Sequence, residues 1–313
     1  MSEQKHTAQQ FAQEIANPSE LVQLRHALKD LVFFPKKIAR SQLAGNQRSA
    51  FRGRGMDFEE VRHYQPGDDV RSIDWRVTAR TRTPHTKVFR EERERPILVI
   101  ADLRRPMLFG SEQLKAQSVC QLSTALAWSG IQANDRVGAM LFGTRQQIDI
   151  RPRRSHHTVL QLINSLQTLC ADLIEQPEDK YRLSNIIEET RRIAHPGTSV
   201  FLVSDFHDLD DSCQENLYEL AKHCDVTLCH IFDGLEKELP PPGNYPVVVN
   251  GIRQSLNTRN QKMREHCVEV FSNRREQLKL LAARLRMGWL ELCTDQSVPA
   301  LLQRSYGKRR ARA

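Results

Sequence analysis

The arrangement of apolar residues predicts strands and helices in alternation from residue 97 onward. Six short runs are apolar on both faces, as strands covered by helices are, at residues 97–101, 137–142, 147–150, 199–204, 226–232 and 289–293. Between most of these runs, apolar residues recur every three or four positions, which is the spacing of one helical face. This alternation predicts an α/β domain over residues 97–306, with a doubly wound, mostly parallel sheet and helices on both faces.

Helix and turn signals add detail to this prediction. Ser212 and Thr258 are each followed three residues later by Glu or Gln, the spacing of a capping box, so each predicts the start of a helix. An Asn-Gly pair at residues 250–251 lies between two extended runs. It predicts a small hairpin insertion in the α/β domain at about residues 239–257.

The ends of the chain do not follow the alternation. Residues 1–19 are polar, and we expect them to be a flexible N-terminus. Residues 20–96 begin with leucines at helical spacing and then become rich in Arg, Asp, Gly and Pro. They predict an N-terminal helix followed by a loop-rich subdomain that contains short strands. Residues 307–313 are predicted to form a basic tail.

Positive charge is concentrated in two segments. The formal net charge of the chain is +8; residues 40–105 hold 14 Arg and 1 Lys against 10 acidic residues, and residues 304–313 hold 4 Arg and 1 Lys without an acid. The apolar runs are far shorter than the roughly 18 residues of a membrane span, and the first residues lack a signal-peptide pattern. Seven cysteines without a CxxC motif do not indicate a disulfide framework. We therefore expect a cytoplasmic protein without direct membrane insertion.

Three aspartates, Asp102, Asp205 and Asp233, directly follow predicted strands. Ligands of open α/β sheets bind at the carboxyl ends of the strands, so these side chains are the first candidates for a site. Carboxylates are ligands that Mg²⁺ prefers. The structural alternative is that each Asp caps the next helix or pairs with an arginine, and for a single Asp this is the commoner role.

A strand, an Asp and a helix, with Ser-Asp after a later strand, resemble the von Willebrand factor A fold. The resemblance implies a metal site built from Asp-x-Ser-x-Ser, a Thr and a further Asp. Asp102 and Asp205 match the aspartates and Ser184 stands in for the Thr, whereas Arg104 and Pro106 replace both serines. We therefore expect a degenerate site, a partner-binding rim in which the Arg104 guanidinium replaces the metal and ties Asp102 to Asp205. No cofactor is expected, and Mg²⁺ at Asp102 and Asp205 remains the alternative.

Residues 53–94, GRGMDFEEVRHYQPGDDVRSIDWRVTARTRTPHTKVFREERE, are similar to the signature of the family called domain of unknown function 58. The signature positions are Gly53, Gly55, Phe58, Arg62, Tyr64, Gly67, Asp68, Asp69, Arg71, Asp74, Trp75 and Arg80. Asp57 stands where the family has Glu. Later segments extend the resemblance to nearly the whole chain, in a short form of the family without transmembrane helices.

Considered by its residues alone, this signature predicts a structural or interaction role rather than catalysis. Pro66 and Gly67 predict a turn to which the next Asp hydrogen-bonds. Four of its arginines can balance its four aspartates, and we expect an internal ion-pair network with Trp75 as its anchor. The residues expected in that network are Arg62, Arg71, Arg76 and Arg80 with Asp57, Asp68, Asp69 and Asp74.

Three hypotheses about function follow. The first is a non-enzymatic protein-binding adaptor, because the resemblance implies association with a MoxR-type AAA+ ATPase and its clients, and von Willebrand A domains bind proteins at this rim. The second is a nucleic-acid-binding protein that uses the basic C-terminal tail, although the tail lacks interleaved aromatic residues for base stacking. The third is a metal-dependent hydrolase at Asp102 and Asp205, which Arg104 and Pro106 disfavour.

Overall fold

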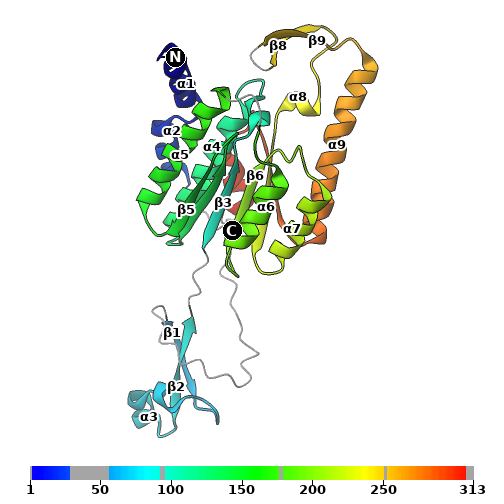
Figure 1. The fold of residues 1–313 in the computed structure, drawn as a ribbon. Helices are drawn as coiled ribbons and strands as arrows, with labels where there is room; N and C mark the ends of the chain where they lie inside the picture. Colours follow the sequence, from blue (N-terminus) through cyan, green and yellow to red (C-terminus); the bar gives the residue numbers. More distant parts are fainter. Residues whose placement is uncertain (1, 29–55, 92–95, 176–178, 250–251, 308–313) are drawn as a thin grey trace, which may run out of the picture. The chain divides into compact units, whose positions relative to one another are not determined.

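The chain divides into two compact units in a computed structural model that describes residues 2–28, 56–91, 96–175, 179–249 and 252–307. Residues 1–35 and 95–313 make up the first, called the α/β unit below, and residues 36–94 make up the second, the signature unit. Figure 1 labels many of the elements of both.

The α/β unit is built on a six-stranded sheet in the order β10-β7-β6-β3-β4-β5 (Figure 1). Its strands are β3 (Ile97–Asp102), β4 (Val137–Phe142), β5 (Gln147–Arg153), β6 (Ser199–Ser204), β7 (Asp225–Phe232) and β10 (Gly288–Cys293). All neighbours pair in parallel except β5, which runs antiparallel to β4 at one edge. The predicted mixed α/β architecture with a mostly parallel sheet is therefore confirmed.

Helices cover both faces of this sheet, because both faces are apolar. On β3, Ile97 and Val99 belong to one buried cluster, whereas Leu98 and Ile100 belong to another. The first cluster includes residues of α1 (Ser2–Ile15), α2 (Pro18–Ala27), α4 (Lys115–Gln132), α5 (His156–Glu175) and α10 (Val298–Tyr306). The second includes residues of α6 (Leu183–Ile193), α7 (Asp211–Ala221) and α9 (Gln261–Arg284). The short helices η2 (Arg105–Leu108) and α8 (Gly234–Lys237) follow β3 and β7.

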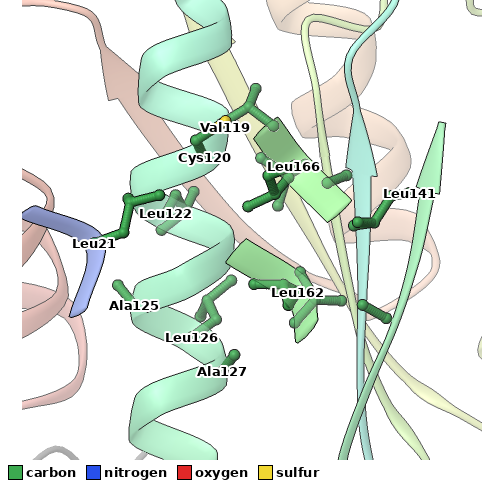
Figure 2. Packing of buried hydrophobic residues seen from close by; sticks show 14 of the residues in the cluster. Leu21, Val119, Cys120, Leu122, Ala125, Leu126, Ala127, Leu141, Leu162 and Leu166 are labelled. Atoms are coloured by element: carbon green, nitrogen blue, oxygen red, sulfur yellow. The ribbon is translucent and has the colours of Figure 1, made fainter. Parts of the chain in front are cut away.

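The first two helices belong to the core of the α/β unit. Leu21 of α2 is buried in the cluster that Figure 2 shows, and the indole Nε1 of Trp128 donates a hydrogen bond of 3.0 Å to its carbonyl. Ala12 and Ile15 of α1 are buried in the same cluster, and α1 contacts α5. The prediction of a flexible N-terminus over residues 1–19 is wrong, because α1 has an apolar face that packs on the unit. The predicted N-terminal helix, α2, groups with the α/β unit rather than with the signature residues.

Two helices begin at other capping residues than predicted. The Asp210 carboxylate caps α7 by accepting a hydrogen bond of 2.7 Å from the Cys213 amide, and Asn260 caps α9. Ser212 lies inside the first turn of α7. The buried Thr258 hydroxyl donates instead to a carbonyl in the loop before β8, at 2.8 Å. The predictions of Ser212 and Thr258 as caps are therefore wrong.

The hairpin insertion is present. Strands β8 (Asn244–Val249) and β9 (Ile252–Asn257) pair in antiparallel register, as predicted. The residues of its turn, 250–251, lie outside the described residues, as does most of the predicted basic tail, at 308–313. Among the helices of the described part, none combines the length and the apolarity that crossing a bilayer requires.

The signature unit consists of an antiparallel ribbon, β1 (Met56–His63) with β2 (His85–Glu91), and two helices between these strands, η1 (Val70–Ser72) and α3 (Trp75–Thr81). The turn predicted at Pro66 and Gly67 precedes η1. The amide of Asp68 donates to the carbonyl of Gln65 at 3.0 Å, and Gly67 has a φ of 109°, which residues with a Cβ rarely adopt. The Asp68 carboxylate accepts from the Gln65 amide at 2.9 Å, so the prediction of this turn is confirmed.

Candidate functional site

Buried charged side chains gather at the carboxyl edge of the sheet, between β3 and β6. Asp102 ends β3, and Asp205 follows the last residue of β6. The strand order reverses here, because β4 lies on one side of β3 and β6 on the other. Such a switch point is where open α/β sheets bind ligands. We call this cluster, formed by Asp102, Arg104, Lys115, Asp205 and Asp208, the rim.

Arg104 joins two carboxylates at the centre of the rim. Its side chain is buried, and all five of its N–H groups have acceptors. Nε and Nη2 donate to the two oxygens of Asp102 at 2.9 and 2.8 Å, and Nη1 and Nη2 donate to those of Asp208 at 2.6 and 2.9 Å. Nη1 also donates to the carbonyl of Tyr181 at 3.2 Å. Both carboxylates are thus held in bidentate pairs, which are strong and fix geometry.

Asp102 has no oxygen left for a further ligand. Its Oδ1 accepts from the backbone amide and Nε of Arg104, and its Oδ2 accepts from Nη2 of Arg104 and from the Ser204 hydroxyl at 2.7 Å. The Ser204 hydroxyl in turn accepts from the amide of Phe206 at 3.0 Å. Each oxygen therefore accepts two hydrogen bonds, which is the full capacity of a carboxylate.

A second buried cation, Lys115, neutralises Asp205. Its Nζ donates to Asp205 Oδ2 at 2.7 Å and to Glu236 Oε1 at 3.1 Å, and it faces the ring of Phe109 with 5.7 Å to the centroid. The other oxygen of Asp205 accepts from the amide and from Nδ1 of His207, at 3.2 and 2.9 Å. Both oxygens of Asp205 therefore accept hydrogen bonds, Oδ1 two and Oδ2 one.

The prediction that Arg104 ties Asp102 to Asp205 is wrong in its second partner. Arg104 bridges Asp102 to Asp208, in the loop after β6, because Lys115 already supplies the counter-charge of Asp205. The Arg104 guanidinium does pair with the Asp102 carboxylate, as expected. A second ion pair, Lys115 with Asp205, was not predicted.

Asp233, the third aspartate after a strand, is a helix cap. Its Oδ1 accepts from a backbone amide two residues on, and its Oδ2 accepts from the amide and hydroxyl of Ser111 and from the hydroxyl of Thr294. The Glu236 carboxylate accepts from the Asp233 amide at 2.9 Å, which closes a capping box. Because Glu236 also accepts from Lys115, this cap is connected to the rim.

Neighbouring charges favour the ionised forms of Asp205, Lys115, His207 and Asp208. Burial would raise the pKa of Asp205, but the charge of Lys115 and the hydrogen bond from His207 hold that pKa well below its usual range. Burial would lower the pKa of Lys115 and of His207, but the neighbouring carboxylates raise both. The pKa of Asp208 is lowered by Arg104 against the effect of its burial. Asp205, Lys115 and Asp208 therefore belong to formed ion pairs rather than to groups that exchange protons near neutral pH.

The rim does not fit the divalent cation that the resemblance to von Willebrand A domains implies. Fixed positive charges, the Arg104 guanidinium and the Lys115 ammonium, stand directly against the carboxylates of Asp102 and Asp205. Within the ranges that the structure describes, no group of three or more His, Cys, Asp or Glu side chains is arranged to hold a metal ion. Neither Asp102 nor Asp205 is therefore available as a metal ligand for a hydrolase.

Several rim residues were not predicted from the sequence, and one predicted residue is peripheral. Ser184 lies in the first turn of α6, where its neighbour Leu183 donates its amide to Asp208 at 3.0 Å. The unpredicted residues are Lys115, His207, Asp208 and Glu236. Lys115 gave one signal, because a cation in the first turn of a helix is unfavourable for the helix dipole and indicates a tertiary carboxylate partner.

In the signature unit, most aspartates bind the backbone rather than arginines. Asp69 caps η1, and Asp74 caps α3, each by accepting hydrogen bonds from amides two or three residues on. Asp74 also lies 3.5 Å from Nζ of Lys87. Arg62 and Asp68 pair at 2.7 Å, as predicted. The short Asp side chain reaches its own turn more readily than it reaches a distant arginine.

The predicted ion-pair network and its anchor are therefore largely wrong. Arg71, Arg76 and Arg80 are exposed, and in the described part of the chain none of them has an ion pair or a side-chain hydrogen bond. Trp75, the predicted anchor, is 67% exposed. The aspartates that would balance these arginines are used as caps.

The other signature positions serve the backbone of the unit. Phe58 lies in β1, and the Tyr64 hydroxyl donates to the carbonyl of Asp68 at 3.3 Å. Gly53, Gly55 and the segment that holds them lie outside the described residues.

Comparison with known proteins assigns the chain to a family. The model of the family described as protein of unknown function DUF58 matches residues 60–277. The chain belongs to this family. Uncharacterized proteins of Mycobacterium bovis and of Mycobacterium tuberculosis are each 27% identical to this DUF58 chain over 225 residues, which is 71% of this chain and 69% of each relative. The match to the family model begins in β1 and ends in α9, so it includes the rim and the signature residues from Arg62 to Arg80.

Two solved structures are similar to part of this DUF58 chain. The conserved hypothetical protein BatB from Bacteroides thetaiotaomicron matches with a TM-score of 0.43 and 14% identity. An aerotolerance-related membrane protein from Bacteroides fragilis, with multiple mutations to serines, matches with a TM-score of 0.42 and 10% identity. Each match covers 67% of this chain and 96% of the other.

Proposed function

We propose that this protein is a cytoplasmic, non-enzymatic adaptor whose rim docks onto a MoxR-type AAA+ ATPase or onto a client of that ATPase. The observation that carries the proposal is the closed ion-pair network of the rim. The carboxylates of Asp102 and Asp205 are each bound by a buried cation and by further donors of the same chain. Groups bound in this way fix the loops around them, and a surface that is fixed before binding loses less entropy when a partner docks.

The apolar side chain of Phe109 gives the rim a contact group for a partner. Its ring is 43% exposed and lies over Lys115, a buried residue of the network. A partly exposed aromatic side chain on a rigid base is typical of the few residues that dominate a protein interface. We therefore take Phe109 as the centre of the proposed docking surface.

The proposal also takes the α/β unit to be similar to a von Willebrand factor A domain. Its support is the position of Asp102 and Asp205 at the ends of neighbouring strands β3 and β6, with Arg104 in place of a cation. The association of the family with MoxR-type ATPases, which the resemblance implies, supports the choice of partner. The seven cysteines are free thiols, as expected in a reducing compartment.

Co-purification of the tagged, full-length protein with nucleotide and Mg²⁺ present tests this function. We expect an AAA+ ATPase to be recovered with the unchanged chain and to be lost with Phe109→Asp. The matched control is Leu280→Asp. Leu280 is 61% exposed near the C-terminal end of α9, which leads to the amino end of β10 and not to the carboxyl ends of the strands. Recovery of no AAA+ protein, or equal recovery with Phe109→Asp, would contradict the proposal.

A further inference from the structure

We propose that the exposed face of α3 and η1 is a second protein-binding surface, and that it binds an acidic segment of a partner protein. This surface, called the Trp75 surface below, consists of Val70, Arg71, Trp75, Arg76 and Arg80. It belongs to the signature unit and is a different site from the rim. The outcome of its test therefore does not depend on whether the rim has the proposed docking function.

Arg76 and Arg80 are one turn apart on α3 and share a face, and exposed apolar residues lie close to them in the sequence. Trp75, Arg76 and Arg80 are exposed positions of α3, whereas the hydroxyl of Thr78 accepts from the amide of His85 in β2 at 3.0 Å. Trp75 is 67% exposed, and Val70, five residues earlier, is 58% exposed. Trp and Arg are the residue types most enriched among those that dominate binding energy, and a tryptophan left in water has a large apolar area to bury.

The backbone below this surface is held rigidly. The Ser72 hydroxyl lies 2.9 Å from that of Thr86 in β2, and Ile73 forms a β-bridge to the same residue. The amide of Asp74 donates to the carbonyl of His85 at 2.8 Å. The segment from η1 to α3 is thus fixed to β2 on both sides of Trp75. Fixing it before binding reduces the entropy that complex formation costs.

The charge of the surface indicates an acidic occupant. Arg71, Arg76 and Arg80 have no anionic partner in the described part of the chain, because Asp69 and Asp74 cap helices. A carboxylate-bearing segment would supply partners for planar guanidinium groups. A second copy of the chain would bring the same arginines face to face across a two-fold axis, which electrostatic repulsion opposes.

An acidic protein segment fits better than a nucleic acid. Strands of nucleic acid are bound by several aromatic side chains along a continuous basic groove. Here the exposed apolar groups are one indole, of Trp75, and one aliphatic side chain, of Val70, and the exposed Asp69 interrupts the positive charge. A mixed apolar and cationic surface of this kind matches a peptide in which acidic and apolar residues alternate.

Binding of a fluorescently labelled peptide of alternating Glu and Leu to the full chain tests the proposal. We expect binding at low salt that weakens as salt rises, and a loss of affinity of about tenfold or more for Trp75→Ala. Arg76→Gln with Arg80→Gln should weaken binding by a similar factor. The matched control is Tyr218→Ala, since Tyr218 is 51% exposed on α7 with Nζ of Lys222 at 4.4 Å from its ring centroid. This control should bind the peptide as the unchanged chain does.

Four results would overturn the proposal. These are no binding of the peptide, equal binding by Trp75→Ala, an equal loss in Tyr218→Ala, and tighter Trp75-dependent binding of an oligothymidine, which would assign the surface to nucleic acid. Light scattering adds a check, because a dimer that Trp75→Ala dissociates would assign the surface to a second copy and overturn the proposal too. Circular dichroism should be unchanged in each variant, because the substituted side chains are exposed.

Discussion

Replacing Arg104 by Met would leave the buried Asp102 carboxylate without its counter-charge. Asp102 is 1% exposed and would lose two of its four hydrogen bonds, keeping those from the Ser204 hydroxyl and from a backbone amide. Asp208 would also lose its partner, but its side chain is 24% exposed and can be hydrated. Removing one partner of a buried ion pair lowers the free energy of unfolding by about 3–5 kcal/mol. Because Asp208 can be hydrated, we expect a loss at the lower end, about 3 kcal/mol.

Unfolding measurements would check this magnitude against a matched arginine on the surface. Arg192 also pairs with two carboxylates, Glu188 at 2.7 Å and Glu189 at 3.5 Å, but its side chain is 63% exposed. We expect Arg192→Met to lower the free energy of unfolding by less than about 1 kcal/mol. In urea titrations followed by far-ultraviolet circular dichroism, the free energy of unfolding should fall in Arg104→Met by about three times as much as in Arg192→Met, or more. In thermal unfolding its Tm should fall by about 6–12 °C, since each kcal/mol shifts a domain of this size by about 2–4 °C.

A double substitution separates the stranded charge from a loss of packing. Adding Asp102→Asn to Arg104→Met replaces the uncompensated carboxylate by a neutral amide that still accepts from the Ser204 hydroxyl. We expect part of the lost stability to return. Equal losses for Arg104→Met and Arg192→Met, or no recovery in the double variant, would refute the assignment of the rim as a buried ion-pair network.

Three further outcomes are expected. The Asp205 carboxylate raises the pKa of His207 in the folded state, so protonated His207 stabilises the fold fully below its ordinary pKa of about 6.5. This stabilisation is lost as pH rises through the raised pKa, and the free energy of unfolding declines. His207→Gln should flatten that decline, and an unchanged slope would contradict the prediction. Gly138→Ala should lower the free energy of unfolding by about 1–3 kcal/mol, because a Cβ there would lie 2.7 Å from a backbone oxygen of β5. Gly234→Ala, at a position with open space around it, should change it by less than about 0.5 kcal/mol. Trp75→Phe should remove most of the tryptophan fluorescence that iodide quenches, because Trp75 is 67% exposed. If iodide quenches the same fraction of the fluorescence in this variant, Trp75 is covered and the prediction is contradicted.

Sequence patterns were sufficient for the sheet because its strands are short, apolar on both faces and separated by helical spacings. All six predicted strands are present, and the α/β architecture follows from them. Caps were less predictable, because Asp210 and Asn260 lie within two residues of Ser212 and Thr258, and tertiary hydrogen bonds decide which residue begins the helix. The apolar face of α1 was hidden among polar residues, so its burial could not be foreseen.

The rim was predicted in position but only partly in its contacts. Strand ends placed Asp102 and Asp205 at one edge, and the replacement of a serine position by Arg104 indicated a guanidinium there. Which carboxylate faces which cation depends on loop paths that have no periodic signal, so Lys115 and Asp208 were missed. In the signature unit, the presence of both Arg and Asp suggested pairing, but composition does not distinguish an Asp that caps a helix from one that binds an arginine.

The pairs of the rim also constrain the order in which the α/β unit assembles. Arg104 and Asp208 are 104 residues apart in the chain, and Lys115 and Glu236 are 121 residues apart. Contacts between such distant segments form after local ones, because closing a long loop has an entropic cost. Until β6 and β7 have joined the sheet, Lys115 lacks both of its anions, and Arg104 has Asp102 but lacks Asp208. In pulse-labelling refolding experiments, the amide of Ser111, which donates to Asp233 at 2.8 Å, should gain protection from hydrogen exchange after the amides that pair β3 with β4. A partner that recognises the closed rim would therefore bind completed domains and pass over half-folded ones.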